Sequence, residues 1–600
     1  MTQASTGFDP EAVRAKYLRE RDKRLISGRA EIRDLDNDPE FGHYRRDPFT
    51  PWSERDTISN DVDVCILGGG IAGIALGVEL RKAGVENIRF VDTAGGFGGT
   101  WYWNRYPGVM CDVESYIYLP MLEETGYIPK RRYAFGDEIL EYLQSLATQF
   151  DLNRDALFHT SVKRASWDES AKRWIIETDR GDRFATRYYT IAPGILNLLK
   201  LPTIPGMAEF KGHSFHSARW DYEFTGGAPG NPLTKLKDKV VGMIGTGATG
   251  IQCVPALADG SKHLWIFQRT PSAIGARNNQ ATDSTFASNL KPGWQQERMD
   301  NFQAIMLGRP VEDDLTNDGW THHYAKVQNP PARLPGESAA DWFTRWEAVD
   351  YEIMQAHRSR VESTVGDTAT AEILKPWYRY LCKRPCFHDE YLPSFNNDNV
   401  TLVDCPSGID RVVEDGVIVD GKKIELDCII YATGFEAEAT PLYRRAGHDV
   451  IGTNGQTLAD LWSGGASSLY GLMIRGLPNL FAMPGPAQQS VVTVNYTQLA
   501  VLGAEVVGRT IAQLLSKGGP TFEVSAAAEN DWNQKILASF ADASALMAAC
   551  TPSRINNEGH PESRNPLNGN YGRGFGDYFG YRELLNDWVA AGQFEGLELR

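Results

Sequence analysis

The sequence predicts an α/β protein built on two separate βαβ units. A short apolar strand, "DVCILGGG", runs into glycines, a helical pattern follows over "IAGIALGVELRKAG", and a second strand, "IRFVD", ends at residue 92. The same order returns at 239–269, where "KVVGMIGTGATGIQ" leads into "LWIFQR". A strand, a glycine turn and a helix in this order are typical of Rossmann-like dinucleotide-binding domains. We therefore expect two such domains, one for each of two dinucleotides.

Composition narrows the class of function. The chain has 600 residues, of which 42% are hydrophobic and 23% charged, as in soluble globular proteins with more than one core. Its net charge of -16 argues against a nucleic acid or an anionic membrane as the main partner, because both require clustered basic residues. Eight thinly spread cysteines do not resemble a disulfide framework. With no signal peptide and no uninterrupted apolar run long enough to span a bilayer, the sequence predicts a cytoplasmic protein that acts on small molecules.

The chain divides into four predicted parts. Residues 1–60 should form a helix, capped by Asp9 with Pro10 at its first position, followed by an extended arm. We expect the first dinucleotide domain to be formed by two segments, 61–205 and 426–600, the second of which includes the C-terminal region. The second domain should cover 206–425, with a helical insertion at about 280–375. The strands and Asp-Gly turns predicted from 399 onwards are expected to rejoin the sheet of the first unit.

The first glycine motif has the spacing of a dinucleotide fingerprint. Gly68 allows a tight turn, Gly70 lets a pyrophosphate approach the backbone, and Gly73 permits close packing of the helix. Asp92, at the end of the second strand, could hold the hydroxyl pair of a ribose. The strand, helix and acid together make this pattern far more specific than three glycines alone.

The second glycine motif differs from the first in one informative place. Gly245, Gly247 and Gly250 repeat the fingerprint, but the following strand ends in Arg269 and Thr270 instead of an acid. An arginine with a neighbouring hydroxyl suits a 2′-phosphate, whereas a carboxylate would repel it, so we expect this site to prefer NADPH to NADH. The alternative is that Arg269 is an ordinary solvated surface charge.

Two further stretches are ambiguous on the residues alone. The aromatic segment 95–112, "GGFGGTWYWNRYPGVMCD", could be core or could wall a flat ring system beside the first dinucleotide. Cys382 and Cys386 could form a redox pair or a zinc site, but we interpret them as ordinary buried thiols, and no metal site is predicted.

A third motif lies between the two units. The stretch "FKGHSFHSARWD" matches FxGxxxHxxxW followed by Asp, with Phe210, Gly212, His216, Trp220 and Asp221 in the defining positions. Together with the flanking glycine motifs, "GGTWYWNRYPG" and "ATGF", it resembles the type I Baeyer-Villiger monooxygenases, from roughly residue 60 to residue 490. The resemblance implies that this stretch is a hinge between the domains, in which His216 senses or relays their orientation.

The resemblance also implies site residues. "CKRPC" places Arg384 as the active-site arginine and Lys383 as a second contact to the 2′-phosphate, and Asp112 would orient Arg384. Val109-Met110 stands where members commonly show Ala-Arg. The positions matching cofactor contacts are Gly99, Thr100, Trp101, Trp103 and Tyr118 for the flavin, and Thr246 to Gln252 for the NADP pyrophosphate.

The implied activity is oxygenation of a ketone to an ester or lactone. FAD would take a hydride from NADPH and react with O₂ to give a flavin C4a-peroxide, which Arg384 would stabilise. An N- or S-oxygenating flavin monooxygenase is the nearer alternative, and a flavin redox sensor that forms no organic product is the more distant one. A pyridine-nucleotide disulfide reductase is disfavoured because Cys65 and Cys111 stand alone. The Trp-rich insertion and C-terminal region could line a pocket for cyclic or steroid-like ketones, while the particular ketone and the oligomeric state stay open.

Overall fold

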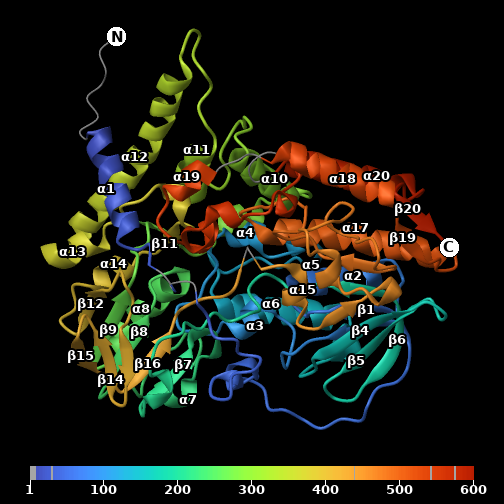
Figure 1. Ribbon diagram of the computed structural model, residues 1–600, viewed down its shortest axis with the longest axis horizontal. Coiled ribbons are helices and arrows are strands. Elements are labelled where there is room, and N and C mark those ends of the chain that lie inside the picture. Colours follow the sequence, from blue (N-terminus) through green and yellow to red (C-terminus); the bar gives the residue numbers. More distant parts are fainter. Residues whose placement is uncertain (1–8, 27, 29–30, 438–439, 541–543, 573–575) are drawn as a thin grey trace.

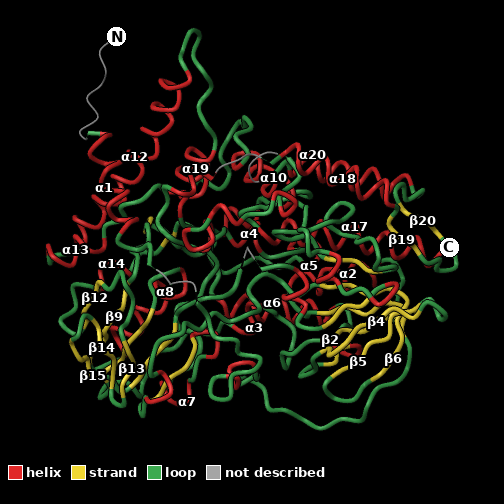
Figure 2. Tube along the Cα trace, in the orientation of Figure 1, coloured by secondary structure: helices red, strands yellow, loops and turns green. Residues whose placement is uncertain are grey.

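The computed structural model describes residues 9–26, 28, 31–437, 440–540, 544–572 and 576–600. Two sheets dominate the molecule and lie at opposite sides of the view in Figure 1, the larger one beside the C-terminus. Most helices of the insertion and of the C-terminal region lie along the top of this view, above the two sheets, as the red tubes of Figure 2 show. The predicted α/β class is confirmed.

The first sheet has eight strands, ordered β17-β4-β5-β6-β1-β2-β3 with β18 paired to β6. Its bounds are β1 Val62–Leu67, β2 Ile88–Val91, β3 Ala156–Leu157, β4 Val162–Asp168, β5 Arg173–Thr178, β6 Arg183–Ile191, β17 Asp449–Ile451 and β18 Leu480–Ala482. The strand β1 is parallel to β2 and β6, and the helix α2 Ile71–Lys82 follows it. The first predicted βαβ unit is therefore present, and late strands complete its sheet.

The helix α17 Tyr496–Ser516 packs along α2 and buries most of its residues. Among the described helices it alone is long and apolar enough, by length and composition, to cross a membrane. The sequence shows no uninterrupted run here because Glu505 and Arg509 break the apolar pattern. Its apolar faces are used inside the protein, as in a core helix.

The second sheet has five parallel strands in the order β12-β9-β8-β16-β7. Its bounds are β7 His213–His216, β8 Val240–Ile244, β9 His263–Gln268, β12 Val400–Asp404 and β16 Cys428–Tyr431, with α8 Ala248–Gly260 following β8. The second predicted βαβ unit is thus present as well.

The expectation for the segment from 399 onwards is wrong. The strand β12 pairs with β9, and β16 lies between β8 and β7, so both belong to the second sheet and not to the first. The expected domain boundary at 425/426 consequently falls just before a strand of the second sheet. A short, wholly buried strand such as "CIIY" carries no signal that says which of the two sheets it joins. The predicted Asp-Gly turn is present, between β14 Gly416–Val419 and β15 Lys422–Glu425, with β13 Arg411–Val413 beside them.

Helices form most of the insertion, as predicted. They are α9 Ser284–Ser288, α10 Trp294–Met306, α11 Ala325–Gln328, α12 Ala339–Thr364 and α13 Thr368–Leu374. The N-terminal helix α1 Pro10–Asp22 begins after Asp9, whose carboxylate accepts a hydrogen bond from the Glu11 N–H as an N-cap does, and α1 packs beside α12 (Figure 1). In the described part of the arm that follows, turns at 35–37 and 39–41 lead into the 3₁₀ turn η1 Gly42–Arg45, and the stretch 51–61 is free of turns.

The remaining α-helices and strands, apart from α6, are short or C-terminal. They are α3 Thr100–Trp103, α4 Ser115–Tyr118, α5 Leu122–Thr125, α6 Gly136–Gln149, α7 Tyr222–Thr225, β10 Ile274–Gly275, β11 Cys386–Phe387, α14 Tyr391–Ser394, α15 Leu442–Ala446, α16 Leu458–Leu461, β19 Phe522–Val524, α18 Ala526–Ser539, α19 Ser544–Ala548, α20 Tyr578–Ala591 and β20 Leu597–Leu599.

The glycine at the third fingerprint position is required by packing. A Cβ at Gly73 would lie 1.9 Å from the backbone oxygen of Gly68, so Gly73→Ala must push α2 away from β1. We expect this variant to lose about 1–3 kcal/mol of stability, because an overfilled core costs that much, and to lose bound flavin. Melting temperature and flavin absorbance measure both effects.

Gly464→Ala is the matched control, because a Cβ at this exposed glycine would meet no atom within 4 Å. A Gly73→Ala protein that melts and retains flavin like the Gly464→Ala protein would contradict the packing role.

Candidate active site

One large cavity of about 1240 Å³ lies between the two sheets and the C-terminal region. Most of the residues predicted to bind cofactor or to act in catalysis line it: Gly68, Gly70, Asp92, Gly99, Thr100, Trp101, Trp103, Asp112, Tyr118, Gly245, Thr246, Gly247, Gln252, Arg269, Thr270, Lys383 and Arg384. Gly73 and Gly250 do not line it, since each packs against its own turn. The structure therefore brings the candidates from both units to one space.

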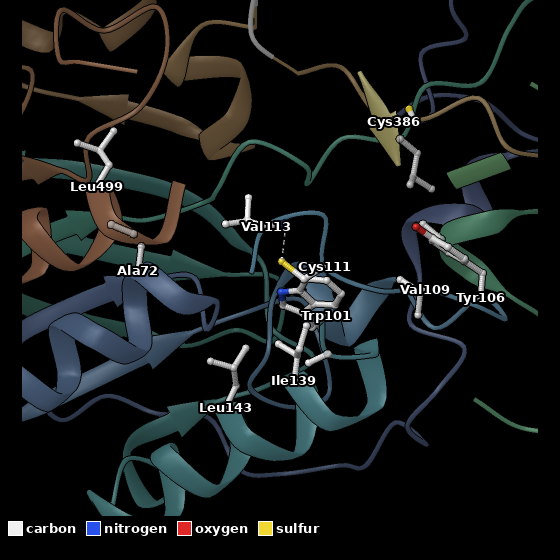
Figure 3. Packing of buried hydrophobic residues seen from close by; sticks show 14 of the residues in the cluster. Ala72, Trp101, Tyr106, Val109, Cys111, Val113, Ile139, Leu143, Cys386 and Leu499 are labelled. Carbon is white, nitrogen blue, oxygen red and sulfur yellow. Dashed lines mark hydrogen bonds between the residues drawn. The ribbon is translucent and has the colours of Figure 1, made fainter. Parts of the chain in front are cut away.

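The first unit contributes an aromatic wall. The turn at Gly99 has a φ of +54°, a left-handed conformation that favours glycine, and it leads into α3, which carries Thr100, Trp101 and Trp103. The Trp101 indole donates a hydrogen bond to the Tyr118 hydroxyl at 2.9 Å. Its other surroundings are apolar, including Ile139 of α6 (Figure 3). The segment that sequence alone left ambiguous is thus both core and cavity wall.

Asp92 lies at the end of β2, at the edge of the cavity. Its carboxylate accepts hydrogen bonds from the backbone N–H groups of Gly69 at 2.5 Å and Ala94 at 2.8 Å. Burial raises the pKa of Asp92, which these hydrogen bonds partly oppose. This position is compatible with the predicted contact to a ribose.

The helices that follow the two glycine turns begin without a side-chain cap. Gly70 precedes α2 and Gly247 precedes α8, and neither N-terminus receives a side-chain hydrogen bond, whereas α1, α12 and α13 are capped by Asp or Ser. A Cβ at Gly247 would meet nothing within 4 Å. Uncapped N–H groups and a positive helix end suit a pyrophosphate, so the residues fit two dinucleotides.

The candidate 2′-phosphate residues lie together. The Lys383 ammonium donates a hydrogen bond to the Thr270 carbonyl at 3.4 Å, which places it beside the end of β9. Arg269 is half-buried at the same end. Two cations at the point where the first unit has an acid agree with the predicted preference for NADPH.

Arg384 and Asp112 form a two-point ion pair at the cavity wall. The Arg384 Nε donates to Asp112 Oδ2 at 2.8 Å and its Nη2 donates to Oδ1 at 3.0 Å. Burial raises the pKa of Asp112, but the charge and hydrogen bonds of Arg384, with the charges of Arg277 and Arg554, outweigh burial and hold that pKa below its usual range. Asp112 is therefore ionised at neutral pH, and the plane of the guanidinium is fixed.

The motif at 210–221 does not line the cavity. Its centre forms β7, an edge strand of the second sheet, and a 3₁₀ turn follows at Ser217–Arg219. Asp221 accepts a hydrogen bond from the Phe224 N–H at 2.9 Å as the N-cap of α7. Gly212 is needed because a Cβ there would lie 2.6 Å from the Asp427 carbonyl oxygen. Trp220 is buried and donates a hydrogen bond to the Thr225 hydroxyl, and Phe210 is half-buried against the core.

One residue of this motif reaches the first unit. The Arg219 guanidinium lies 3.9 Å from the centre of the Trp103 ring. Burial lowers the pKa of its neighbour His216 to about 3, so that imidazole is neutral at neutral pH. The expected hinge and relay role stays a prediction.

Comparison with known proteins matches this geometry. Residues 66–126 match the family model described as an NAD(P)-binding Rossmann-like domain. The chain is 45% identical to a pentalenolactone D synthase of Streptomyces exfoliatus over 98% of this chain and all of that one. It is 42% identical to Baeyer-Villiger monooxygenase 4 of a Dietzia species, over 98% and 96% of the two chains. The chain belongs to the type I Baeyer-Villiger monooxygenases.

The solved structures agree with this assignment. The polycyclic ketone monooxygenase of Thermothelomyces thermophila superimposes with a TM-score of 0.89 at 35% identity, over 98% of this chain and 99% of that one. The protein is an FAD- and NADPH-dependent enzyme that inserts one oxygen atom of O₂ beside a ketone carbonyl, giving an ester or lactone.

Sequence reasoning missed Trp320 of the helical insertion, which contacts both partners of the ion pair in this monooxygenase. Its ring lies 4.6 Å from the Arg384 guanidinium, and its indole N–H donates to the Asp112 backbone carbonyl at 2.7 Å. Trp320 is almost wholly buried, and the Asp318 carboxylate accepts a hydrogen bond from its backbone N–H. No local pattern distinguishes this tryptophan from the other tryptophans of the insertion.

The C-terminal segment also closes on the site, and it corrects the prediction for Cys382. Cys382 forms a disulfide with Cys550, 168 residues away, whereas Cys386 is a buried free thiol as expected. The Ser553 hydroxyl donates to the Cys382 carbonyl at 2.7 Å, and Lys200 pairs with Glu558 at 2.8 Å. Sequence spacing gives no hint of a pairing at this separation. Among the described residues, no group of three or more His, Cys, Asp and Glu could hold a metal ion.

Trp320 should hold Arg384 in its working position. Trp320→Leu removes the ring and the indole N–H, whereas Trp320→Phe retains a ring. Because a desolvated cation–π contact contributes about 2 kcal/mol, we expect kcat to fall more than tenfold in the leucine variant and less in the phenylalanine variant. Steady-state kinetics should show an unchanged KM for NADPH.

Trp346→Phe is the control, since the Trp346 indole also donates to a backbone carbonyl, that of Val327, but belongs to α12. Equal kcat values in Trp320→Leu and wild type would refute the positioning role.

Proposed function

We propose that Arg384, oriented by Asp112, carries the positive charge on which oxygen insertion depends in this enzyme. The observation that carries the proposal is the two-point ion pair at the wall of a cavity that both dinucleotide turns also line. Reduced FAD, when bound, supplies the oxygen atom from O₂. Arg384 stays charged at any physiological pH and stabilises negative charge as it develops on the carbonyl oxygen of the ketone.

Asp112 contributes orientation. Its carboxylate occupies the Nε–Nη2 edge of the guanidinium, so Arg384 cannot rotate without breaking two charge-assisted hydrogen bonds. The Arg277 guanidinium supports the same loop by donating to the Cys111 carbonyl at 2.6 Å. A preorganised cation needs no rearrangement when charge develops, and this is why such groups lower barriers.

We also propose that Arg269, Thr270 and Lys383 recognise the 2′-phosphate of NADPH. Their support is the shared position at the end of β9 and the 3.4 Å contact between Lys383 and Thr270. Val109-Met110 takes the place of the Ala-Arg pair common in the family, so a side-chain contact from Met110 is not part of the proposal. The Met110 carbonyl instead accepts a hydrogen bond from the Gln252 amide at 3.1 Å.

The proposed substrate is a bulky polycyclic ketone. Apolar residues from late in the chain, Val492, Leu499, Phe540 and Ile555, line the cavity in addition to the dinucleotide turns. The relatives named above are a polycyclic ketone monooxygenase and a synthase of the lactone pentalenolactone D, which supports a substrate of several fused rings. The cytoplasmic location predicted from the sequence stays a proposal.

Removing the charge should stop oxygen insertion without stopping flavin reduction. We expect Arg384→Ala to form ester or lactone at least a hundredfold more slowly, because losing one stabilising group of this kind costs about 3–4 kcal/mol in barrier. Arg384→Lys, which keeps charge without the two-point contact, and Asp112→Asn should fall between. Product mass and anaerobic flavin reduction by NADPH are the measurements.

Arg444→Ala is the control, because Arg444 makes the same Nε and Nη2 contacts to Glu436 at the surface. Wild-type product formation by Arg384→Ala would overturn the proposed role.

A ketone panel tests the substrate class. We expect product from steroid-sized ketones at lower KM than from cyclohexanone, and Val492→Trp should impair the large ketones more because it fills the cavity. Leu537→Trp, at an exposed position of α18, is the control. An amine in the panel tests the N-oxygenating alternative. Oxygenation of small ketones alone, scored by product mass, would exclude the polycyclic assignment.

A further inference from the structure

The N-terminal helix α1 is attached to the candidate 2′-phosphate site. Arg24, just after α1, donates from Nε to the backbone carbonyl of Arg269 at 2.7 Å. Arg24 is only 4% exposed, although it carries a full charge. A buried guanidinium on a backbone carbonyl is costly unless its other donors are also satisfied.

Glu20, one turn earlier, accepts hydrogen bonds from a second nitrogen of this guanidinium. Its carbonyl accepts from the Arg24 Nη1 at 2.6 Å and its carboxylate accepts from the same nitrogen at 2.8 Å. Burial acts to raise the pKa of Glu20, but hydrogen bonds from Lys23, Arg24 and Lys16 lower it to about 2. Glu20 is therefore ionised, and Arg24 is held at both ends.

A second set of contacts links α1 to the segment that carries Lys383. The carboxylate of Glu347, a buried residue of α12, pairs with Arg14 of α1 and with Arg379. Arg379 is followed by the single turn η6 Tyr380–Cys382, and Lys383 comes next. The two attachments thus end at Arg269 and close to Lys383, the two cations proposed for the 2′-phosphate.

The helix is fixed firmly enough to serve as a support. Val13 and Tyr17 of α1 are buried with Tyr351 of α12 in one apolar cluster. Arg21 donates from Nη1 to the Ala548 carbonyl at 3.0 Å, two residues before the disulfide at Cys550. The attachments of α1 therefore reach Arg269, Arg379 through Glu347, and a residue close to the disulfide partner of Cys382.

We propose that Arg24 is a positioning residue for cofactor selection, which fixes the backbone at Arg269 so that the Arg269 side chain meets the 2′-phosphate of NADPH. This inference rests on the role proposed above for Arg269. A long side chain amplifies a small rotation of its backbone into a large displacement of its charged end. Loss of the Arg24 hydrogen bond should therefore weaken recognition of the 2′-phosphate and leave the rest of the dinucleotide site unchanged.

Binding of NADP⁺ and NAD⁺ to the FAD-loaded protein tests the proposal, because the two ligands differ only in the 2′-phosphate. Titration calorimetry should show about tenfold weaker NADP⁺ binding in Arg24→Ala, as expected for one lost hydrogen bond to a charged group, and unchanged NAD⁺ binding. Arg19→Ala, an exposed residue of the same helix, should bind both ligands like wild type.

The following results decide between the proposal and its alternatives. Equal weakening of NADP⁺ and NAD⁺ binding, or wild-type NADP⁺ affinity in Arg24→Ala, overturns the proposal. Should Arg24→Ala not fold, as judged by flavin content and melting temperature, Arg24→Lys is measured instead, and a selective loss for NADP⁺ is again required. The Arg269→Ala variant separates the role of Arg269 from that of Arg24. Unchanged NADP⁺ binding by Arg269→Ala refutes the role of Arg269 itself. Weaker NADP⁺ binding by Arg269→Ala, without a loss in the Arg24 variant, refutes only the role of Arg24.

Discussion

The ion pair between Asp112 and Arg384 constrains how the two halves of the molecule can be joined. Asp112 follows the first nucleotide unit, Arg384 lies in a loop attached to the second, and the contact tolerates displacements of only a few tenths of an ångström. Neighbouring hydrogen bonds join the same two domains. Gln252 of α8 bonds to Met110, and Tyr106 bonds back to Gln252 at 2.9 Å. These contacts therefore fix the two domains relative to each other beside the cavity.

Much of this arrangement follows from local sequence. Glycine fingerprints, strand ends and the capping Asp9 act over a few residues, so both βαβ units and α1 could be located before any coordinates. The pairing of Arg384 with Asp112 came from a family resemblance, since nothing in the spacing of two residues 272 positions apart indicates contact. Their geometry then agreed with that expectation.

Other features depend on tertiary context alone. The strand β16 lies between β8 and β7 of the second sheet, a position that its own four apolar residues cannot specify. Cys382 forms a disulfide with Cys550, and Trp320 contacts Arg384, because separate segments fold back over one cavity. In each case the residue looks ordinary in sequence and acquires its role from a partner more than sixty positions away.

The order of the strands along the chain limits how domains can be exchanged between relatives. The first sheet takes strands from before residue 192 and again from after residue 448, and the second takes all of its strands from between them. The second unit is an insertion within the first. A chimaera that exchanges the NADPH-binding half between relatives therefore needs two junctions, near 192–212 and 432–448, while a single crossover would leave one parent's β6 to pair with the other parent's β18.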